Sequence, residues 1–126
     1  MPRLLILDDE KLIRWSLNHI FIEEGYEVDP AATVEEAARL ANSRSYALIL
    51  ADLEVCGDQA MACLSELVRV QKGAKIIVLT AVPGDQAELR LGGFRADRIL
   101  EKPFDSEEIR AAVKAVLAAA PVKEKA

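Results

Sequence analysis

The sequence predicts a doubly wound α/β domain with a five-stranded parallel sheet and five helices. The first supporting observation is a series of short, continuous apolar runs, such as the one at 4–7, which are typical of strands buried on both faces. The second is that segments with helical apolar spacing separate these runs. Strands that alternate with helices in this way form a parallel sheet covered by helices. A chain of 126 residues, 52% of them hydrophobic, fits one such domain.

Residues typical of helix ends support several of the predicted helices. Gly25 follows the first helix as a C-terminal cap. Thr33 with Glu36, and Asp105 with Glu108, have the form of capping boxes that open the second and the fifth helix. In chain order the predicted elements are a strand at 4–7, a helix at 11–24, a strand at 26–28, a helix at 33–41, a strand at 48–51, a helix at 57–71, a strand at 76–79, a helix at 85–91, a strand at 99–100 and a helix at 105–117.

Composition limits the classes of function. The net charge of -5 and the pI near 4.9 argue against direct nucleic-acid binding, because neutralising phosphates requires a basic face. The apolar runs are too short for a signal peptide or a membrane span, so we expect a cytoplasmic protein without membrane contact. Cys56 and Cys63 lack the spacing of a metal site or a redox motif, and we expect two reduced thiols. We expect one domain at 1–120, followed by a polar tail at 121–126 that is either a native end or the start of a linker.

Polar side chains follow four of the predicted strands. Asp8 and Asp9 come directly after the first strand, and Asp52 comes after the third. Thr80 follows the fourth strand, and Lys102 follows the fifth. The carboxyl ends of parallel strands share one edge of the sheet, so these side chains should meet in a single crevice. A carboxylate cluster, a hydroxyl and an ammonium in one crevice describe a phosphoryl-accepting site.

The expected chemistry depends on these groups acting together, because Asp9 alone could be a helix N-cap and Lys102 alone a solvated charge. Neighbouring carboxylates would repel one another, and oxygen ligands of this kind favour Mg²⁺ or Mn²⁺. Asp52 could then attack a phosphoryl group and form an acyl phosphate. Lys102 would neutralise phosphoryl oxygens, and the Thr80 hydroxyl would donate to one of them. A cis bond between Lys102 and Pro103 would turn the ammonium inward.

Four parts of the sequence resemble the receiver domain of two-component response regulators, and the resemblance extends over essentially the whole chain. They are Leu-Ile-Leu-Asp-Asp-Glu at 5–10, Asp52, Thr80-Ala81 and Lys102-Pro103-Phe104. The resemblance implies a flavodoxin-like receiver fold and a switch that promotes only its own phosphorylation and dephosphorylation. By the same resemblance Asp52 is the phosphoacceptor, and Thr80 and Lys102 contact the phosphoryl group. Mg²⁺ would be held by Asp8, Asp9, Asp52 and the backbone carbonyl of Glu54.

The resemblance also implies partners. The phosphodonor would be a histidine kinase or a phosphotransfer protein, and the output would be a downstream effector protein or domain. Two departures concern the output. Val55-Cys56-Gly57 stands where Met-Pro-Gly is common, and Ile99 stands where family members usually have a Tyr or Phe that changes rotamer on phosphorylation. Arg95 adds charge to the surface that many receivers use for output.

Two alternative functions remain at this point. Ile99 and the altered loop favour a protein-interaction module of the same fold whose output is not controlled by phosphorylation, whereas the intact acidic site opposes it. A haloacid-dehalogenase-like phosphatase would need Asp-x-Asp directly after the first strand, where this chain has Asp8-Asp9. We further expect a weak, salt-sensitive homodimer through the fourth helix, fifth strand and fifth helix, because opposite charges lie near one another there. These charges are Arg90, Arg95 and Arg98 on one side and Asp97, Glu107 and Glu108 on the other.

Overall fold

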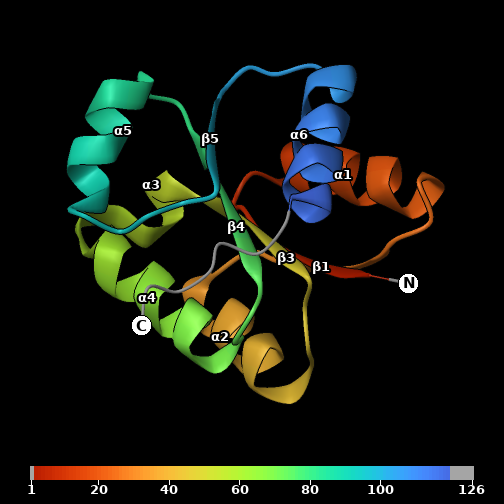
Figure 1. The fold of residues 1–126 in the computed structure, drawn as a ribbon, viewed down its shortest axis with the longest axis horizontal. Helices are drawn as coiled ribbons and strands as arrows, with labels where there is room; N and C mark the ends of the chain where they lie inside the picture. Colours follow the sequence, from red (N-terminus) through yellow and green to blue (C-terminus); the bar gives the residue numbers. More distant parts are fainter. Residues whose placement is uncertain (1, 120–126) are drawn as a thin grey trace.

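The computed structural model describes residues 2–119 and contains a five-stranded sheet between two layers of helices (Figure 1). The strand order is β2-β1-β3-β4-β5 and every neighbouring pair is parallel, which confirms the predicted architecture. In chain order the elements are β1 (Arg3–Leu7), α1 (Lys11–Glu23), β2 (Glu27–Ala31), α2 (Val34–Ser43), β3 (Leu48–Asp52), α3 (Leu53–Cys56), the 3-10 turn η1 (Gly57–Gln59), α4 (Ala60–Val70), β4 (Lys75–Thr80), α5 (Gly84–Leu91), β5 (Arg98–Glu101) and α6 (Ser106–Ala118).

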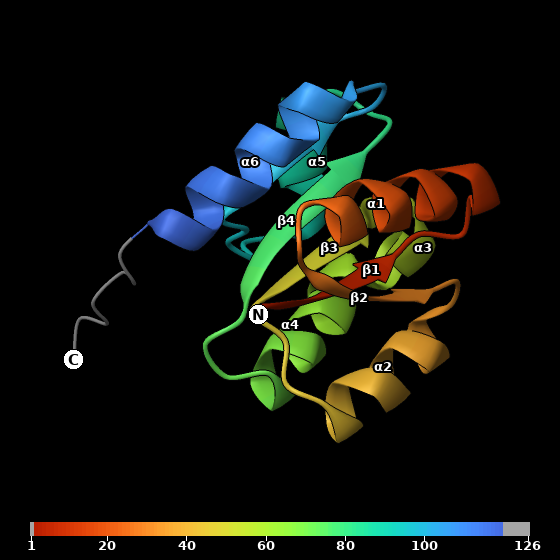
Figure 2. The ribbon, with the colours of Figure 1, turned by 90° about the vertical axis from the view of Figure 1, so that its right-hand side faces the viewer.

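The sheet is buried on both faces because alternate side chains of its strands enter different hydrophobic layers. In β1, Leu4 and Ile6 belong to the layer that includes residues of α1 and α6, whereas Leu5 and Leu7 belong to the layer under α2, α4 and α5. Figure 2 shows the sheet between α1 and α6 on one side and α2 and α4 on the other. Each fully buried side chain of this size contributes about 1.5–3 kcal/mol. The continuous apolar runs of the sequence therefore reflect burial on two faces.

The strand order reverses between β1 and β3, and this reversal positions the polar residues. From β1 the chain crosses to β2 on one side, and from β2 it returns to β3 on the other side of β1. Helices on opposite faces then leave a crevice outside the carboxyl ends of the two strands. Asp8 directly follows β1 and Asp52 is the last residue of β3, so both carboxylates lie at this crevice.

The second strand begins later and extends further than predicted. β2 comprises Glu27–Ala31, whereas the sequence pattern indicated 26–28. Pro30 lies within the strand, which is tolerated because β2 is at the edge of the sheet and a missing N–H on its outer side needs no partner. The ring of Tyr26 packs edge-on against Phe21, with centroids 5.7 Å apart.

The predicted helix at 57–71 begins only at Ala60 in the structure, and a short helix that the sequence did not predict precedes it. The chain forms the single turn α3 and the 3-10 turn η1 before α4 begins at Ala60. Gly57, the C-cap of α3, has a φ of +63°, which residues other than glycine rarely adopt, and this conformation separates α3 from α4. The other four predicted helices are present as separate elements. Their bounds differ by a few residues from the predicted ones, as helix ends commonly do.

The predicted helix caps are largely confirmed. Thr33 Oγ1 accepts a hydrogen bond from the Glu36 N–H at 3.1 Å, and Asp105 Oδ1 accepts one from the Glu108 N–H at 2.7 Å. The Glu36 carboxylate accepts from the Ala32 N–H at 2.8 Å rather than from the N–H of the capping threonine. Gly25 has a φ of +97° at the position after the C-cap Glu24, where helices commonly end with a glycine.

Within residues 2–119, no helix has the length and apolar character needed to cross a bilayer. The predicted tail at 121–126 and the end of the predicted domain at 120 lie outside the described residues.

Candidate functional site

Asp52 is held at the carboxyl end of the central strand β3. Its side chain is 2% exposed, and Oδ1 accepts a hydrogen bond from the Glu54 N–H at 3.0 Å. Asp52 therefore caps the short helix α3, with its other oxygen directed into the crevice. A carboxylate at a helix N-terminus is favoured by the orphan N–H groups of the first turn. This contact fixes the orientation of the predicted phosphoacceptor.

Asp8 lies at the end of the neighbouring strand and is completely buried. Its Oδ1 accepts from the Glu10 N–H at 2.9 Å, and its backbone carbonyl accepts from Arg14 at 2.9 Å. Its Oδ2 lies 3.1 Å from the Lys102 ammonium, although without hydrogen-bond geometry. No donor in the described part of the chain satisfies this oxygen by hydrogen bonding. Asp8 thus presents one unsatisfied carboxylate oxygen to the crevice.

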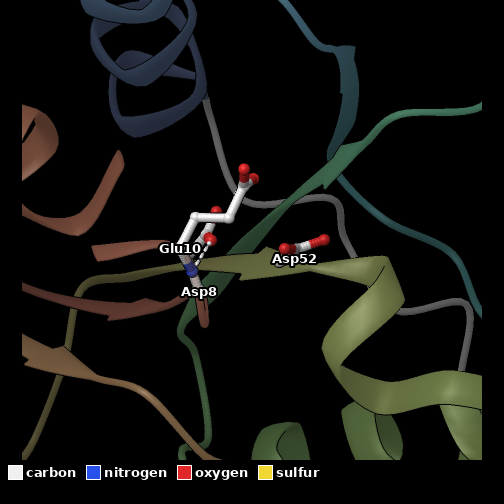
Figure 3. A group of neighbouring side chains, drawn as sticks. All are labelled: Asp8, Glu10 and Asp52. Atoms are coloured by element: carbon white, nitrogen blue, oxygen red, sulfur yellow. Dashed lines mark hydrogen bonds between the residues drawn. The ribbon is translucent and has the colours of Figure 1, made fainter. Parts of the chain in front are cut away.

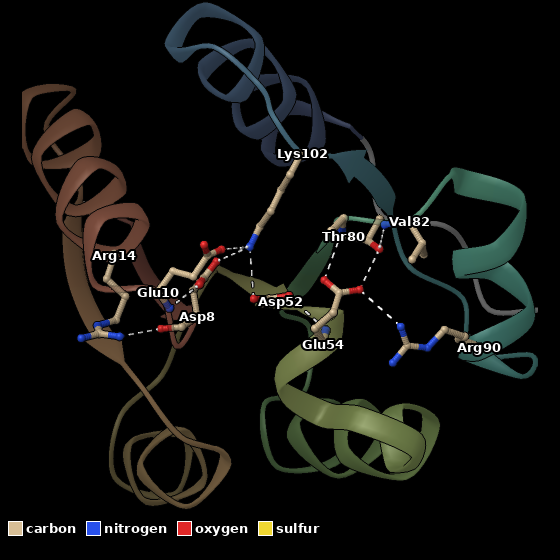
Figure 4. A network of polar contacts seen from close by, with 10 residues as sticks. Asp8, Glu10, Arg14, Asp52, Glu54, Thr80, Val82, Arg90 and Lys102 are labelled. Carbon is tan, nitrogen blue, oxygen red and sulfur yellow. Dashed lines mark hydrogen bonds and ion pairs between the residues drawn. The ribbon is translucent and has the colours of Figure 1, made fainter.

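Lys102 is the cation at the centre of the site (Figure 4). Its Nζ lies 3.1 Å from Asp52 Oδ2, 3.1 Å from Asp8 Oδ2 and 2.8 Å from Glu10 Oε1. Burial opposes the charged form of Lys102, but its hydrogen bond to Glu10 and the attraction of the Asp8 and Asp52 carboxylates raise its pKa above the usual range. Lys102 therefore stays protonated. The Lys102–Pro103 peptide bond is cis, the isomer that the proline allows.

Asp52 is in an unfavourable electrostatic environment. Burial, the adjacent Glu54 carboxylate and repulsion by Asp8 raise its pKa to about 7, although the hydrogen bond from the Glu54 N–H and the charge of Lys102 act in the opposite direction. One lysine thus faces the carboxylates of Asp8, Glu10 and Asp52. Figure 3 shows these three side chains directed toward one another at the strand ends.

These three carboxylates suit a hard divalent cation. Asp8, Glu10 and Asp52 each have an oxygen within 4.8 Å of the others. The unsatisfied Asp8 oxygen and the raised pKa of Asp52 both indicate that added positive charge would stabilise the site. Oxygen-only ligands in small number are those that Mg²⁺ uses while retaining several waters. The residues present therefore fit this ion.

Asp9 differs from its predicted position in the cluster. Its side chain is exposed, and it lies outside the group formed by Asp8, Glu10 and Asp52. The residue before α1 is Glu10, so Asp9 is also not the helix N-cap that was its simpler interpretation. Its role as a Mg²⁺ ligand stays a prediction, as does that of the Glu54 carbonyl.

The Glu54 side chain has a role at the site that sequence reasoning missed. Its carboxylate accepts hydrogen bonds from the Thr80 hydroxyl and the Ala81 N–H, both at 3.1 Å, and pairs with Arg90 at 3.4 Å. Partial burial acts against the charged form, but the adjacent Asp52 carboxyl, the hydrogen bonds from Ala81 and Thr80 and the charge of Arg90 lower the pKa of Glu54. Glu54 is thus an anion whose carboxylate already accepts the hydrogen bonds of the Thr80 hydroxyl and the Ala81 N–H close to Asp52. Its position two residues after Asp52 was the available signal.

Thr80 lies where the sequence predicted it, at the end of β4. It is completely buried, and its hydroxyl accepts from the Val82 N–H at 3.1 Å while donating to Glu54. The backbone N–H of Lys102 donates to the Thr80 carbonyl at 2.7 Å, which joins the ends of β4 and β5. The structure therefore brings Asp8, Asp52, Thr80 and Lys102 to one edge of the sheet, as the strand pattern required.

A buried carboxylate, a lysine and an acidic cluster that fits a divalent cation, all at the switch point of a parallel sheet, are the features of the receiver class of phosphoacceptor domains. Residues 4–114 match the family of response regulator receiver domains. The chain therefore belongs to this family, whose members are phosphoacceptor switches that bind Mg²⁺ at an acidic cluster. The family assignment confirms the resemblance inferred from the sequence and does not favour the alternative of an interaction module independent of phosphorylation.

Several relatives define what the chain is similar to. It is 32% identical to sporulation initiation phosphotransferase F of Bacillus subtilis, covering 91% of this chain and 93% of that protein. It is 35% identical to the transcriptional regulatory protein PmrA of Pectobacterium parmentieri, covering 91% of this chain and 52% of that protein. It is 36% identical to the transcriptional regulatory protein ResD of Bacillus subtilis, of which it covers 48%. The chain thus spans about half the length of these two transcriptional regulators.

Solved structures agree with the fold. A CheY-like receiver domain protein from Methanospirillum hungatei superposes with a TM-score of 0.84 at 26% identity, covering 93% of this chain and 94% of that one. The response regulator TrrA from Thermotoga maritima, solved in complex with Mg²⁺-BeF, has a TM-score of 0.77 at 36% identity, covering 92% and 99%.

Proposed function

We propose that this protein is a phosphorylation-controlled switch in which Asp52 accepts a phosphoryl group from a histidine kinase or a phosphotransfer protein. The observation that carries the proposal is the pairing of the buried Asp52 carboxylate with the Lys102 ammonium at 3.1 Å, next to the unsatisfied oxygen of Asp8. No structural need explains three carboxylates around one lysine at a buried strand edge. An incoming phosphoryl group with a divalent cation accounts for them.

The transfer forms one bond and breaks one. A carboxylate oxygen of Asp52 attacks the phosphorus, and the bond from phosphorus to the donor nitrogen breaks with its electron pair staying on the donor. Lys102 lies where its charge neutralises the phosphoryl oxygens during this step. Hydrolysis reverses the modification when water attacks the acyl phosphate and Asp52 leaves as a carboxylate. We expect both steps to depend on Mg²⁺.

The cation would be Mg²⁺, held by Asp8, Asp9, Asp52 and the backbone carbonyl of Glu54, with Glu10 as a further candidate ligand. When bound, it supplies positive charge to phosphoryl oxygens and lowers the proton affinity of the carboxylates. Asp9 reaches the ion only if its exposed side chain turns toward the crevice. Glu10 is already there, and its contact with Lys102 would be exchanged for the ion.

Transmission of the signal begins at Glu54. A phosphoryl group on Asp52 brings further negative charge and acceptor oxygens, and it competes for the Thr80 hydroxyl and the Ala81 N–H that Glu54 now occupies. Displacement of Glu54 would break its ion pair with Arg90 on α5. The modification thereby changes the β4–α5 loop and the charge of the α5 surface, without requiring an aromatic ring at Ile99.

An apolar cleft of this protein, next to the site, provides a docking surface for the phosphodonor. A cleft of about 670 Å³ between α1 and the start of α6 has Glu10 and Lys102 on its lining, together with Ile13, Pro103 and Phe104. Leu12, also at this cleft, is 78% exposed. A histidine-bearing helix of the donor must bring its phosphoryl group to Asp52, and a cleft that shares Lys102 with the site gives it a place to dock.

The remaining partners follow from the same function. The switch would act on a downstream effector protein or domain through the α5, β5 and α6 surface, and the weak homodimer expected there stays a prediction. Arg90, Arg95 and Glu107 on that surface are exposed. We expect no direct contact of this chain with nucleic acid or membrane and a cytoplasmic location, on the composition alone.

The proposal is tested by labelling with acetyl phosphate and Mg²⁺, followed by intact-mass analysis. Wild type should gain one phosphoryl group, and Asp52→Asn should gain none. Asp29→Asn is the matched control, since it removes a largely buried carboxylate elsewhere and should still be labelled. Equal labelling of Asp52→Asn and wild type would refute the assignment.

The transmission step is tested with Thr80→Ala. This variant should still take up phosphate on Asp52, because the hydroxyl does not perform the attack, but it should show a smaller change in partner binding or self-association. Lys102→Ala should impair uptake as well. If phosphorylated Thr80→Ala changes its association as wild type does, the hydroxyl is not the reporter.

A further inference from the structure

Two cysteines lie next to each other just after the phosphoacceptor. Cys56 is the last residue of α3, Cys63 is in the first turn of α4, and their sulfur atoms are 2.8 Å apart with the Cys56 S–H donating. Both are free thiols. A disulfide has a sulfur–sulfur distance of about 2.05 Å, so the atoms would need to approach by less than ~1 Å to bond. Cys56 is 7% exposed and Cys63 is half-buried, so an oxidant reaches Cys63 more easily.

The backbone between the two cysteines makes this contact possible. In one continuous helix, residues seven positions apart are separated by about 10 Å along the axis, which is too far for a disulfide. Here the break at Gly57, with its φ of +63°, ends α3 and lets it pack against the start of α4 (Figure 1). The turn at Gly57 therefore brings the two thiols into contact.

We propose that Cys56 and Cys63 form a peroxide-responsive thiol pair that closes a reversible disulfide between α3 and α4. Cys63 reacts first. Its thiolate attacks one peroxide oxygen, the O–O bond breaks, and after proton uptake a sulfenic acid and one water result. The Cys56 sulfur then attacks the sulfur of this sulfenic acid, the S–O bond breaks, and a second water leaves with the Cys56 proton. The two thiols lose two electrons and two protons, and the peroxide is reduced to two waters.

The hydrogen bond between the thiols supports this order of events. Because Cys56 donates its S–H to Cys63, the pKa of Cys63 lies below its usual range, although partial burial acts in the opposite direction. A lower pKa increases the fraction of thiolate, which is the reactive form. Cys63 is thus both the more exposed and the more reactive of the two. The buried Cys56 is in place to resolve the sulfenic acid before further oxidation.

The disulfide would act on the phosphorylation site through α3. This helix begins directly after Asp52 and carries Glu54, which has to leave Thr80 and Ala81 when a phosphoryl group enters. A covalent bond from the end of α3 to α4 restricts this movement, so the oxidised protein should take up phosphate more slowly. This consequence rests on the proposed function, whereas the formation of the disulfide does not.

The test begins with the reduced full chain, treated with a small excess of hydrogen peroxide and then alkylated with iodoacetamide under denaturing conditions. Digestion before Asp58, which lies between the two cysteines, should leave their peptides joined and unalkylated, and a reductant should separate them. Cys63→Ser is the matched variant and should show no joined peptides. Free, alkylated thiols after oxidation, sulfinic acid at either cysteine, or a disulfide between two chains would each overturn the proposal.

The effect on the switch is measured as the rate of labelling by acetyl phosphate. Oxidised wild type should be labelled several-fold more slowly than reduced wild type, and Cys63→Ser should be insensitive to peroxide. Labelling at the same rate in both forms would overturn the coupling of the disulfide to Asp52. Failure of the reduced protein to be labelled would instead refute the proposed function, even if the disulfide forms.

Discussion

Two polar clusters beside the sheet differ in charge balance. In the Asp29 cluster, which comprises Arg3, Asp29, Arg44 and Tyr46, the carboxylate is surrounded by donors, and Arg3 also pairs with Glu27 at 2.6 Å. The Asp29 carboxylate lies 3.5 Å from Arg3 and 3.1 Å from Arg44, and it accepts from the Tyr46 hydroxyl at 2.7 Å. At the crevice, three carboxylates surround the single ammonium of Lys102.

The difference separates a structural cluster from a functional one. A carboxylate with two guanidinium groups and a hydroxyl is fully satisfied and holds β1 and β2 to the segment between α2 and β3. The carboxylates at the crevice repel one another and leave Asp8 Oδ2 without a hydrogen bond from residues 2–119. A protein retains such an unfavourable arrangement where a ligand completes it, and here the missing charges are positive.

The largest expected difference between the clusters is in the sign of the change in unfolding free energy when a carboxylate is replaced by an amide. Asp52→Asn should increase the free energy of unfolding by about 2 kcal/mol at neutral pH without Mg²⁺, because it removes a buried charge that Asp8 repels. Asp29→Asn should decrease it by about 1–3 kcal/mol, because it leaves arginines and a hydroxyl with weaker partners. Urea denaturation of both variants measures this, and effects of the same sign would invalidate the comparison.

The pH dependence of stability should reveal the same repulsion. The pKa of Asp52 is about 7 in the folded protein, above its ordinary value, so the folded state binds more protons than the unfolded state between these values. The stabilisation from this group is therefore present in acid and is lost as pH rises toward 7. Relative to Asp52→Asn, metal-free wild type should lose roughly 2 kcal/mol over this range. Parallel stability curves for the two proteins would contradict the raised pKa.

Mg²⁺ should stabilise the crevice and leave the Asp29 cluster unaffected. At ten times its dissociation constant, an ion that binds only the folded protein contributes about 1.4 kcal/mol, seen as a higher melting temperature. Asp29→Asn should keep this response, and Asp52→Asn should lose most of it. Asp9→Asn and Glu10→Gln then decide the ligand set. If Asp9→Asn loses the rise in melting temperature with Mg²⁺, the predicted ligands are supported. If only Glu10→Gln loses it, the ligands are instead Asp8, Glu10 and Asp52.

The smallest effect on stability is expected for Glu54→Ala, at most about 1 kcal/mol, because the Glu54 side chain is about a third exposed and its ion pair is partly screened. Its effect on phosphorylation should be larger. Labelling by acetyl phosphate should become several-fold faster, because the Thr80 hydroxyl and the Ala81 N–H are released. Glu88→Ala on α5 is the matched exposed control. Unchanged labelling in Glu54→Ala would exclude Glu54 as a competitor for these donors.

Local sequence signals were sufficient for the fold and for most of the site. The continuous runs at 4–7, 48–51 and 76–79 predicted buried parallel strands, because burial on both faces removes the need for alternation. Once the strands were known to be parallel, the shared edge of their carboxyl ends brought Asp52, Thr80 and Lys102 together. These predictions required only the periodicity of the chain and the direction of the strands.

Side-chain contacts across the crevice were decided only by the tertiary structure. Nothing in the order of residues shows that Glu10 reaches Lys102, that Glu54 reaches Thr80, or that Asp9 is exposed while Asp8 is buried. The contact between Cys56 and Cys63 likewise depends on the turn at Gly57, which helical spacing did not reveal. Periodicity encodes which face of an element is buried. The pairing of polar groups from different elements instead depends on distances that are set when the elements pack.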